Sequence, residues 1–224
     1  MTFTALPPNR YSESVTPHAG YLQPYFAQNW RLFAPSPVAQ DREVLFQASF
    51  AADDGSAQRS PWVNWTEVEL DLIHHRLIGG RAGYVTNKLY TPLSQRYRSL
   101  GTVQKGVADA TDETAPPDWP ALRAAMEGGG ADPARVAAFL TYEQATARLA
   151  TGVVAGRWPD RRLIAVRYKL RSHPVVPYAQ RSGSSAERAA ARPLATERTS
   201  GWRSPTPGGD DERRAIAAFD RRHR

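Results

Sequence analysis

The alternation of apolar and polar positions predicts three β-strands. Apolar residues occupy every second position from Val44 to Phe50, and the polar segment 53–56 that follows is typical of a turn. A second apolar run around Trp62 can return as the hairpin partner, and the alternation around Tyr168 indicates a late strand. The predicted strands cover residues 42–52, 60–66 and 162–172.

Apolar residues spaced three or four positions apart predict helices elsewhere in the chain. Residues 21–33 form one such segment, which must end at Pro35 and Pro37 because proline cannot continue a helix. The cleanest pattern begins at Asp132 and is expected to end near Gly152. Further helices are predicted over about 67–77, 84–105 and from Asp118 onward. This order of elements predicts an α+β fold, in which a small antiparallel sheet packs with several helices.

The composition predicts one folded domain with a basic tail. The 224 residues are 41% hydrophobic, which is enough for one sizeable core. Of the formal net charge of +7, residues 181–224 contribute ten basic and six acidic side chains among few apolar ones, as in many disordered segments. We therefore expect an extended N-terminal segment (1–20), a single α+β domain (21–178) and a low-complexity tail (179–224) that is mostly disordered.

Several kinds of chemistry find no support in the sequence. The absence of cysteine excludes disulfides, thiolate metal ligands and thiol catalysis. The glycines of segments 80–83 and 128–130 lack the spacing of a phosphate-binding loop, and the serines of segment 182–185 lack the strained turn that holds a hydrolase nucleophile. No apolar stretch is long enough to span a membrane. We expect no cofactor, and a non-enzymatic role is favoured.

One acid–imidazole cluster keeps an enzyme as the alternative class. Asp71 and His75 are four residues apart and so share a helix face, with His74 beside them. Such side chains can hold a divalent metal or transfer protons, which would suit a metal-dependent, hydrolase-like enzyme. The competing interpretation is a solvated helix face with ordinary side-chain pairs.

A basic and aromatic segment precedes the tail. Its cations are Arg157, Arg161, Arg162, Arg167, Lys169 and Arg171. Together with Trp158 and Tyr168, they could hold anionic lipid headgroups, or nucleic acid through phosphate contacts and base stacking. The simplest interpretation is a strand with a polar outer side. A nucleic-acid-binding protein is the second alternative, although a nucleic-acid partner is not expected.

The segment with the highest density of aromatic residues lies near the N-terminus. Its predicted apolar contacts are Tyr25, Phe26, Trp30 and Phe33; Gln28 and Asn29 supply polar groups, and Pro35 and Pro37 a rigid turn into the first strand. Aromatic rings with polar neighbours favour a protein groove or the boundary between membrane and water. Packing of this helix on the sheet, with Trp30 in the core, is equally consistent with the pattern.

The stretch PYFAQNWRLFAPSP, residues 24–37, resembles the signature of an uncharacterised bacterial family that is known only as a domain of unknown function. A similar W-x-[LM]-F-A-P-x-P motif occurs in multi-spanning membrane proteins related to the vitamin K-dependent carboxylase, where it joins the membrane part to an extramembranous sheet. No carboxylase residue can be carried over, because those catalytic elements lie in transmembrane segments. The resemblance implies a transmembrane helix before the equivalent of Pro7, and we expect it upstream of Met1.

Together these observations predict a non-enzymatic, membrane-associated interaction or accessory module. The expected partner is a membrane surface or an integral membrane protein, with a carboxylase-like multi-spanning protein as the specific candidate. The expected location is extracytoplasmic if an upstream transmembrane helix exists, and cytoplasmic otherwise.

Overall fold

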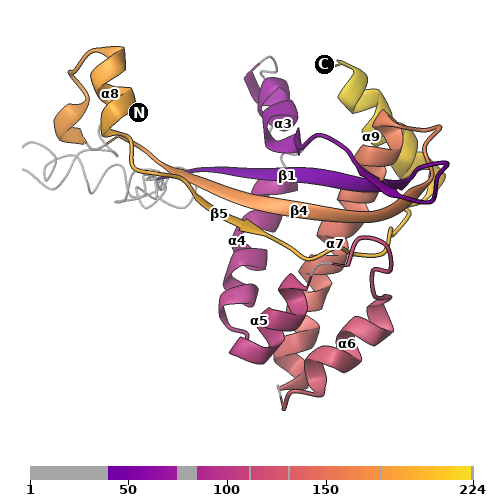
Figure 1. Ribbon diagram of the computed structural model, residues 1–224. Coiled ribbons are helices and arrows are strands. Elements are labelled where there is room, and N and C mark those ends of the chain that lie inside the picture. The colour runs from indigo at the N-terminus through magenta and orange to yellow at the C-terminus, as the bar shows by residue number, and fades with distance from the viewer. Residues whose placement is uncertain (1–39, 75–84, 111, 131, 177, 223–224) are drawn as a thin grey trace, which may run out of the picture. The chain divides into compact units, whose positions relative to one another are not determined.

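The computed structural model describes residues 40–74, 85–110, 112–130, 132–176 and 178–222. Its centre is a five-stranded antiparallel sheet with the order β2-β1-β4-β5, in which β3 also pairs with β1 (Figure 1). The strands are β1 (Gln40–Ala51), β2 (Ala57–Arg59), β3 (Val63–Asn64), β4 (Leu163–Pro174) and β5 (Thr196–Thr199). The predicted α+β class is confirmed, and β1 pairs with the late strand β4 along almost its whole length.

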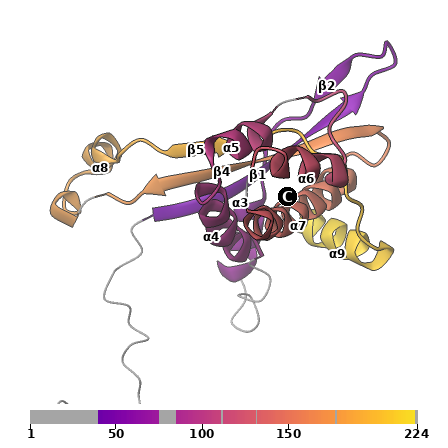
Figure 2. The ribbon, with the colours of Figure 1, turned by 90° about the horizontal axis from the view of Figure 1, so that it is seen from below.

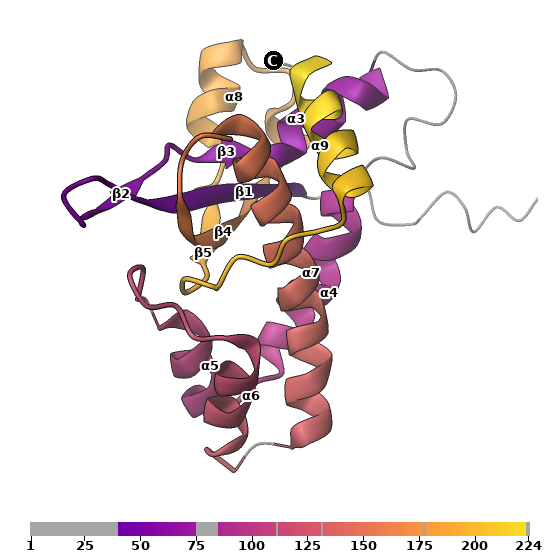
Figure 3. The same cartoon turned by 90° about the vertical axis from the view of Figure 1, so that its right-hand side faces the viewer.

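The helices surround one face and two edges of this sheet. They are α3 (Trp65–His74), α4 (Val85–Arg98), α5 (Thr102–Asp109), α6 (Trp119–Glu127), α7 (Pro133–Arg157), α8 (Ser185–Ala191) and α9 (Asp210–Arg222), with a short 3₁₀ turn, η4 (Tyr178–Gln180). The helices α3, α4 and α7 contact β1, α7 also contacts β4, and α9 packs against α7. Figures 1 and 3 show α3 and α9 on the β1 side of the sheet and α5 and α6 on the β5 side. Figure 2 shows α8 at the end of the sheet opposite β2.

The core lies between the sheet and α7. The residues Val44, Phe46, Ala48 and Phe50 point from β1 toward this helix and are almost fully buried, because successive side chains of a strand point to opposite faces. At the start of α7, the Asp132 carboxylate accepts a hydrogen bond from the backbone N–H of Ala134 at 2.9 Å, as an N-cap does.

The long helix α7 continues past its predicted end at Gly152 to Arg157. Gly152 is useful within the helix because α9 approaches it closely: a Cβ at this position would lie 2.7 Å from the Ile216 Cδ1 atom. The glycine that was predicted to end the helix is therefore the residue that lets α9 pack closely against α7.

The predicted strand 60–66 forms two shorter pieces, β2 and β3. Pro61 has no N–H to donate to the sheet, and the Ser60 hydroxyl takes over part of the pairing by accepting a hydrogen bond from Ala48 N at 3.0 Å. The chain then turns directly into α3 at Trp65.

The structure differs from the sequence prediction over 179–222, which was expected to be mostly disordered. This segment contains α8, β5 and α9, and β5 pairs with β4, so it belongs to the same sheet as the central strands. Both Trp202 and Arg203 are only 1% exposed. A few long-range contacts therefore hold this segment in a defined conformation, although its average composition is polar.

Candidate functional site

The face of the sheet turned away from α7 carries three of the six cations that the sequence singles out. We call it the outer face and define it by Glu43, Leu45, Gln47 and Ser49 of β1, Ala165, Arg167, Lys169 and Arg171 of β4, and the tryptophans Trp62 and Trp202. The register places these strand side chains on one face, because Gln47 is opposite Arg167 and Leu45 is opposite Lys169. The outer face is thus a layer of aromatic and charged side chains on buried strands.

Cations and aromatic rings alternate across the outer face. The guanidinium of Arg167 lies 4.4 Å from the ring centroid of Trp202 and 5.2 Å from that of Trp62. Lys169 extends the row at 4.9 Å from Trp62, and Arg59 lies 5.9 Å from Trp202. We call these five residues the cation–π ladder. Each contact stabilises by about 0.5–2 kcal/mol, and more strongly as water is excluded.

Gln47 fixes the orientation of the central cation of the ladder. Its Oε1 atom accepts hydrogen bonds from Arg167 Nε at 2.9 Å and Nη2 at 2.6 Å, while its own Nε2 donates to the Ser60 carbonyl at 2.7 Å. Burial lowers the pKa of Arg167, and the neighbouring charge of Arg59 lowers it further. Among the described residues, no carboxylate lies within ion-pair distance of Arg167, and its Nη1 atom has no hydrogen-bond partner.

The cations on either side of Arg167 are paired with carboxylates. Lys169 lies 2.9 Å from Glu197, and Arg171 contacts the same carboxylate at 2.5 Å. These contacts, led by the hydrogen bond from Lys169, lower the pKa of Glu197. Arg171 also lies 3.3 Å from Glu43.

At the far end of the ladder, Arg59 pairs with Glu113 at 2.5 Å. The positive charge of these neighbouring cations is therefore largely balanced, whereas Arg167 has no carboxylate partner among the residues that the structure describes.

The structure brings together only part of the predicted basic surface. Arg167, Lys169 and Arg171 form one row, but Arg157 ends α7 and pairs with Asp220 of α9 at 2.6 Å. Arg161 stacks over the Phe50 ring at 4.3 Å, and Arg162 is exposed at the start of β4. Periodicity predicts the row along the strand, but it cannot locate side chains that precede the strand.

The acid–imidazole candidates are only partly within the described residues. Asp71 lies on α3, His74 ends that helix, and His75 is outside the described residues. Within the described part of the chain, no group of three or more histidine, aspartate or glutamate side chains is placed to hold a metal. Asp71 contributes to a cleft of about 530 Å³ that reaches the outer face at Trp62. Its lining residues are Trp62, Val63, Asn64, Glu67, Val68, Asp71, Arg157 and Arg222.

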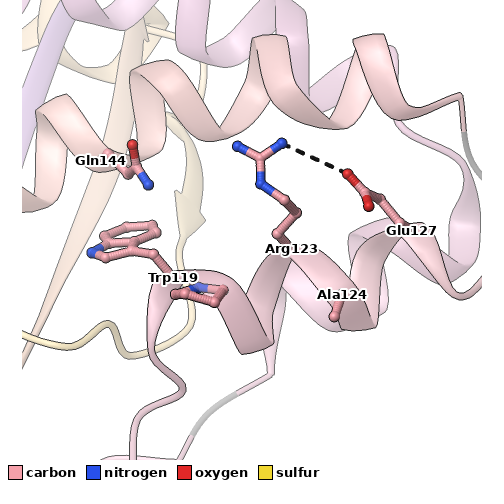
Figure 4. Close-up of a pocket in the computed structure, with 6 residues that line it drawn as sticks. Trp119, Arg123, Ala124, Glu127 and Gln144 are labelled. Carbon is pink, nitrogen blue, oxygen red and sulfur yellow. Dashed lines mark ion pairs between the residues drawn. The ribbon is translucent and has the colours of Figure 1, made fainter.

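A second hollow, of about 310 Å³, lies between α6 and α7 (Figure 4). Trp119 forms its aromatic wall, with Gln144 of α7 nearby, and Arg123 pairs with Glu127 at 3.7 Å across one side. The Trp119 indole N–H donates to the Thr206 hydroxyl at 2.9 Å, so this ring is anchored to the segment that follows β5. The hollow has one aromatic wall and one internal ion pair, and it offers no unpaired cation.

A buried polar network joins the C-terminal segment to α7. Glu143 accepts hydrogen bonds from Arg203 Nε at 2.9 Å and from the Tyr168 hydroxyl. Arg198 donates to the Tyr168 hydroxyl at 3.1 Å and pairs with Asp109 of α5 at 3.1 Å. Burial, followed by the charge of Glu143, raises the pKa of Tyr168.

This network was missed by the sequence reasoning, although one signal was present. Glu143 lies on the apolar stripe of α7, between Leu140 and Ala147, where a carboxylate has to find a buried partner. The network joins α5, α7, β4 and β5, so it holds these elements together.

The predicted N-terminal interaction residues lie outside the described residues. They are Tyr25, Phe26, Gln28, Asn29, Trp30, Phe33, Pro35 and Pro37. In the described part of the chain, none of the helices has both the length and the apolar composition needed to cross a membrane.

Comparison with known proteins gives a family but no function. A protein family described as a family of unknown function (DUF5819) matches residues 9–205 of the chain. The match includes the whole cation–π ladder and Arg203. No curated protein and no solved structure is significantly similar to the chain.

Proposed function

Because the chain belongs to this family of unknown function, we propose its role from the geometry of the outer face: it is a non-enzymatic interaction module that binds another protein there. The observation that carries the proposal is the arrangement of Arg167, which makes cation–π contacts with both Trp62 and Trp202 and is oriented by Gln47. A side chain held in this way loses little conformational freedom when a partner binds.

The residue types of the outer face support a protein partner. Tryptophan and arginine are enriched among the residues that contribute most to binding energy at protein interfaces. Trp62 is half-buried and Arg59 exposed, so both can contact a partner, while Trp202 supports them from beneath. The buried strands below provide a rigid platform.

The charge balance of the outer face favours a protein over nucleic acid. Nucleic-acid affinity comes largely from cations that neutralise several phosphates at once. Here Lys169 and Arg171 are already bound to Glu197, and Arg59 is bound to Glu113. A partner that offers one or two charges among polar and apolar groups matches this surface better.

The N-terminal aromatic segment adds a second contact to the proposal. Residues 21–33 would seat the module on a bilayer or on an integral membrane protein, and the resemblance of residues 24–37 suggests a carboxylase-like multi-spanning partner. In this arrangement the module faces outside the cytoplasm.

Capture from a detergent extract of membranes tests the proposed interface. The immobilised full chain should retain a defined protein that Trp62→Ala fails to retain. The control is Trp119→Ala, which removes an equally large, half-buried ring away from the outer face. Circular dichroism confirms that both variants fold. Retention of the same protein by a folded Trp62→Ala variant would contradict the proposal.

Vesicle binding tests the N-terminal contact separately. If the segment lies on the bilayer, Trp30→Ala should reduce co-sedimentation with vesicles, whereas Trp62→Ala should not. If neither variant changes co-sedimentation, the aromatic segment does not bind the bilayer, and the capture experiment alone decides the partner.

A further inference from the structure

We propose that Arg167 is a receptor for a carboxylate side chain of the protein partner, so that the outer face recognises an aspartate or glutamate placed among apolar residues. This inference rests on the proposed function and specifies the chemistry of the partner. It starts from the one guanidinium of the outer face that has no carboxylate among the described residues.

The geometry leaves a defined set of donors for the partner. Gln47 Oε1 engages Nε and Nη2 of Arg167, and the hydrogen bond from Gln47 Nε2 to Ser60 prevents the amide from turning away. The Nη1 group then remains without an acceptor in the described part of the chain. A planar guanidinium forms its strongest hydrogen bonds with carboxylates, which it can meet through two parallel N–H groups.

The surroundings of Arg167 make a partner anion favourable. The rings of Trp62 and Trp202 both lie close to the guanidinium, and the water that they displace strengthens its attraction for an approaching charge. Burial and the nearby Arg59 both lower the pKa of Arg167, so an incoming carboxylate relieves an unfavourable environment.

The adjacent pairs limit the number of charges that the partner can bring. Glu197 and Glu43 hold Lys169 and Arg171, and they would repel a second anion placed farther along β4. A polyphosphate chain would meet this repulsion at successive groups, whereas a single carboxylate would not. The surface is therefore complementary to an isolated acidic side chain.

The test uses the 224-residue chain and, as the probe, a fluorescein-labelled hexapeptide with an amidated C-terminus that carries one glutamate among leucine, tyrosine and glycine residues. Fluorescence polarisation should show that Arg167→Gln weakens binding about tenfold, as expected when a hydrogen bond to a charged group is lost. The control is Arg162→Gln, which removes an exposed arginine at the start of the same strand and should change affinity by less than about twofold. Arg167→Lys keeps the charge but loses the planar donors, and it should bind nearly as weakly as Arg167→Gln.

Two results of these measurements would overturn the inference. Equal weakening by Arg162→Gln and Arg167→Gln would reveal general electrostatic attraction and overturn it. So would binding of oligodeoxythymidine that is tighter than binding of the peptide and equally dependent on Arg167, because the site would then take phosphate. Circular dichroism of each variant separates loss of the receptor from loss of the fold.

The capture and peptide assays distinguish a failure of the proposed interface from a failure of the carboxylate receptor. If Trp62→Ala loses the captured membrane protein while Arg167→Gln retains full peptide affinity, the interface stands and the carboxylate receptor does not. If both variants behave as the unaltered chain in both assays, the outer face is not an interface.

Discussion

Arg203 and Glu143 form an ion pair that is closed off from solvent, with Nη2 2.8 Å from Oε1 and side-chain exposures of 1% and 0%. The remaining donors of Arg203 reach the carbonyls of Trp202, at 3.0 Å, and Ala108. One side chain thus links the segment after β5 to both α7 and α5. Because two buried charges compensate each other, each is costly to remove alone.

Arg203→Met should therefore lower the free energy of unfolding by about 3–5 kcal/mol, since it leaves the Glu143 carboxylate buried without its cation. The matched control is Arg148→Met, because Arg148 pairs with Glu212 on the surface with side-chain exposures of 49% and 36%, and its loss should cost less than about 1 kcal/mol. Urea unfolding measures both. The double variant Glu143→Met, Arg203→Met should be more stable than Arg203→Met alone; equal or lower stability would contradict the explanation.

Burial of Trp202 predicts that the C-terminal segment contributes to global stability. Trp202→Ala should destabilise by about 3–5 kcal/mol because it empties a site that the fold cannot refill. Leu194→Ala, in the same segment but 91% exposed, should stay within about 0.5 kcal/mol of the unaltered chain. Thermal unfolding of the two variants gives the comparison, and similar melting temperatures would show that the segment does not pack as described.

Two glycines should respond to alanine with opposite signs. A Cβ on Gly201 would lie 1.9 Å from the Ala110 carbonyl oxygen, so Gly201→Ala must displace backbone and should destabilise by about 1–3 kcal/mol. A Cβ on Gly106, inside α5, would meet nothing within 4 Å, and Gly106→Ala should stabilise by about 0.5–1 kcal/mol through helix propensity. Chemical denaturation that gave both variants the same sign would rule out the close contact between α5 and the segment after β5.

The lowered pKa of Glu197 predicts a pH-dependent contribution to stability. The hydrogen bond from Lys169 favours the charged carboxylate in the folded protein, so its contribution is present above the ordinary value of 4.5 and is lost as pH falls through the folded-state pKa. Because the carboxylate is partly exposed, this contribution should stay below about 1 kcal/mol. Unfolding measured from pH 7 to pH 3 should show the stability difference between the unaltered chain and Glu197→Gln shrinking below pH 4.5. A difference that grows toward low pH would contradict this assignment.

The central strands and most helices could be predicted because their patterns are local. Alternation from Val44 to Phe50 identified β1, and the proline after Asp132 identified the start of α7. The fold class followed from the order of these elements.

The strand β5 and the ordered segment that follows it could not be predicted, because both depend on contacts with distant parts of the chain. The strand β5 is held by β4, and Arg198 and Arg203 are neutralised by residues of α5 and α7. Local composition gives no information about these contacts, so the polar composition of this segment was interpreted as disorder. Glu143 on an apolar stripe was the available clue to the buried network.

The candidate site was likewise predicted only in part from the sequence. Periodicity predicted that Arg167 and Lys169 lie on one side of a strand. In the register of β4 against β1, these two residues lie opposite Gln47 and Leu45. The two tryptophans that stack on Arg167 come from a loop before β3 and from the segment after β5, and no sequence spacing relates them. Periodicity also could not show that Glu43, Glu113 and Glu197 balance the neighbouring cations.

The buried position of Arg203 also has a consequence for biosynthesis. As the chain leaves the ribosome, α7 emerges with Glu143 on its apolar stripe well before the arginine that neutralises it. Closing the core around Glu143 without this arginine would cost about 3–5 kcal/mol, so we expect the core to be less stable until residue 203 has left the ribosome. A nascent chain that stops short of this position should therefore be less stable, and more readily cleaved by proteases, than one that includes Arg203.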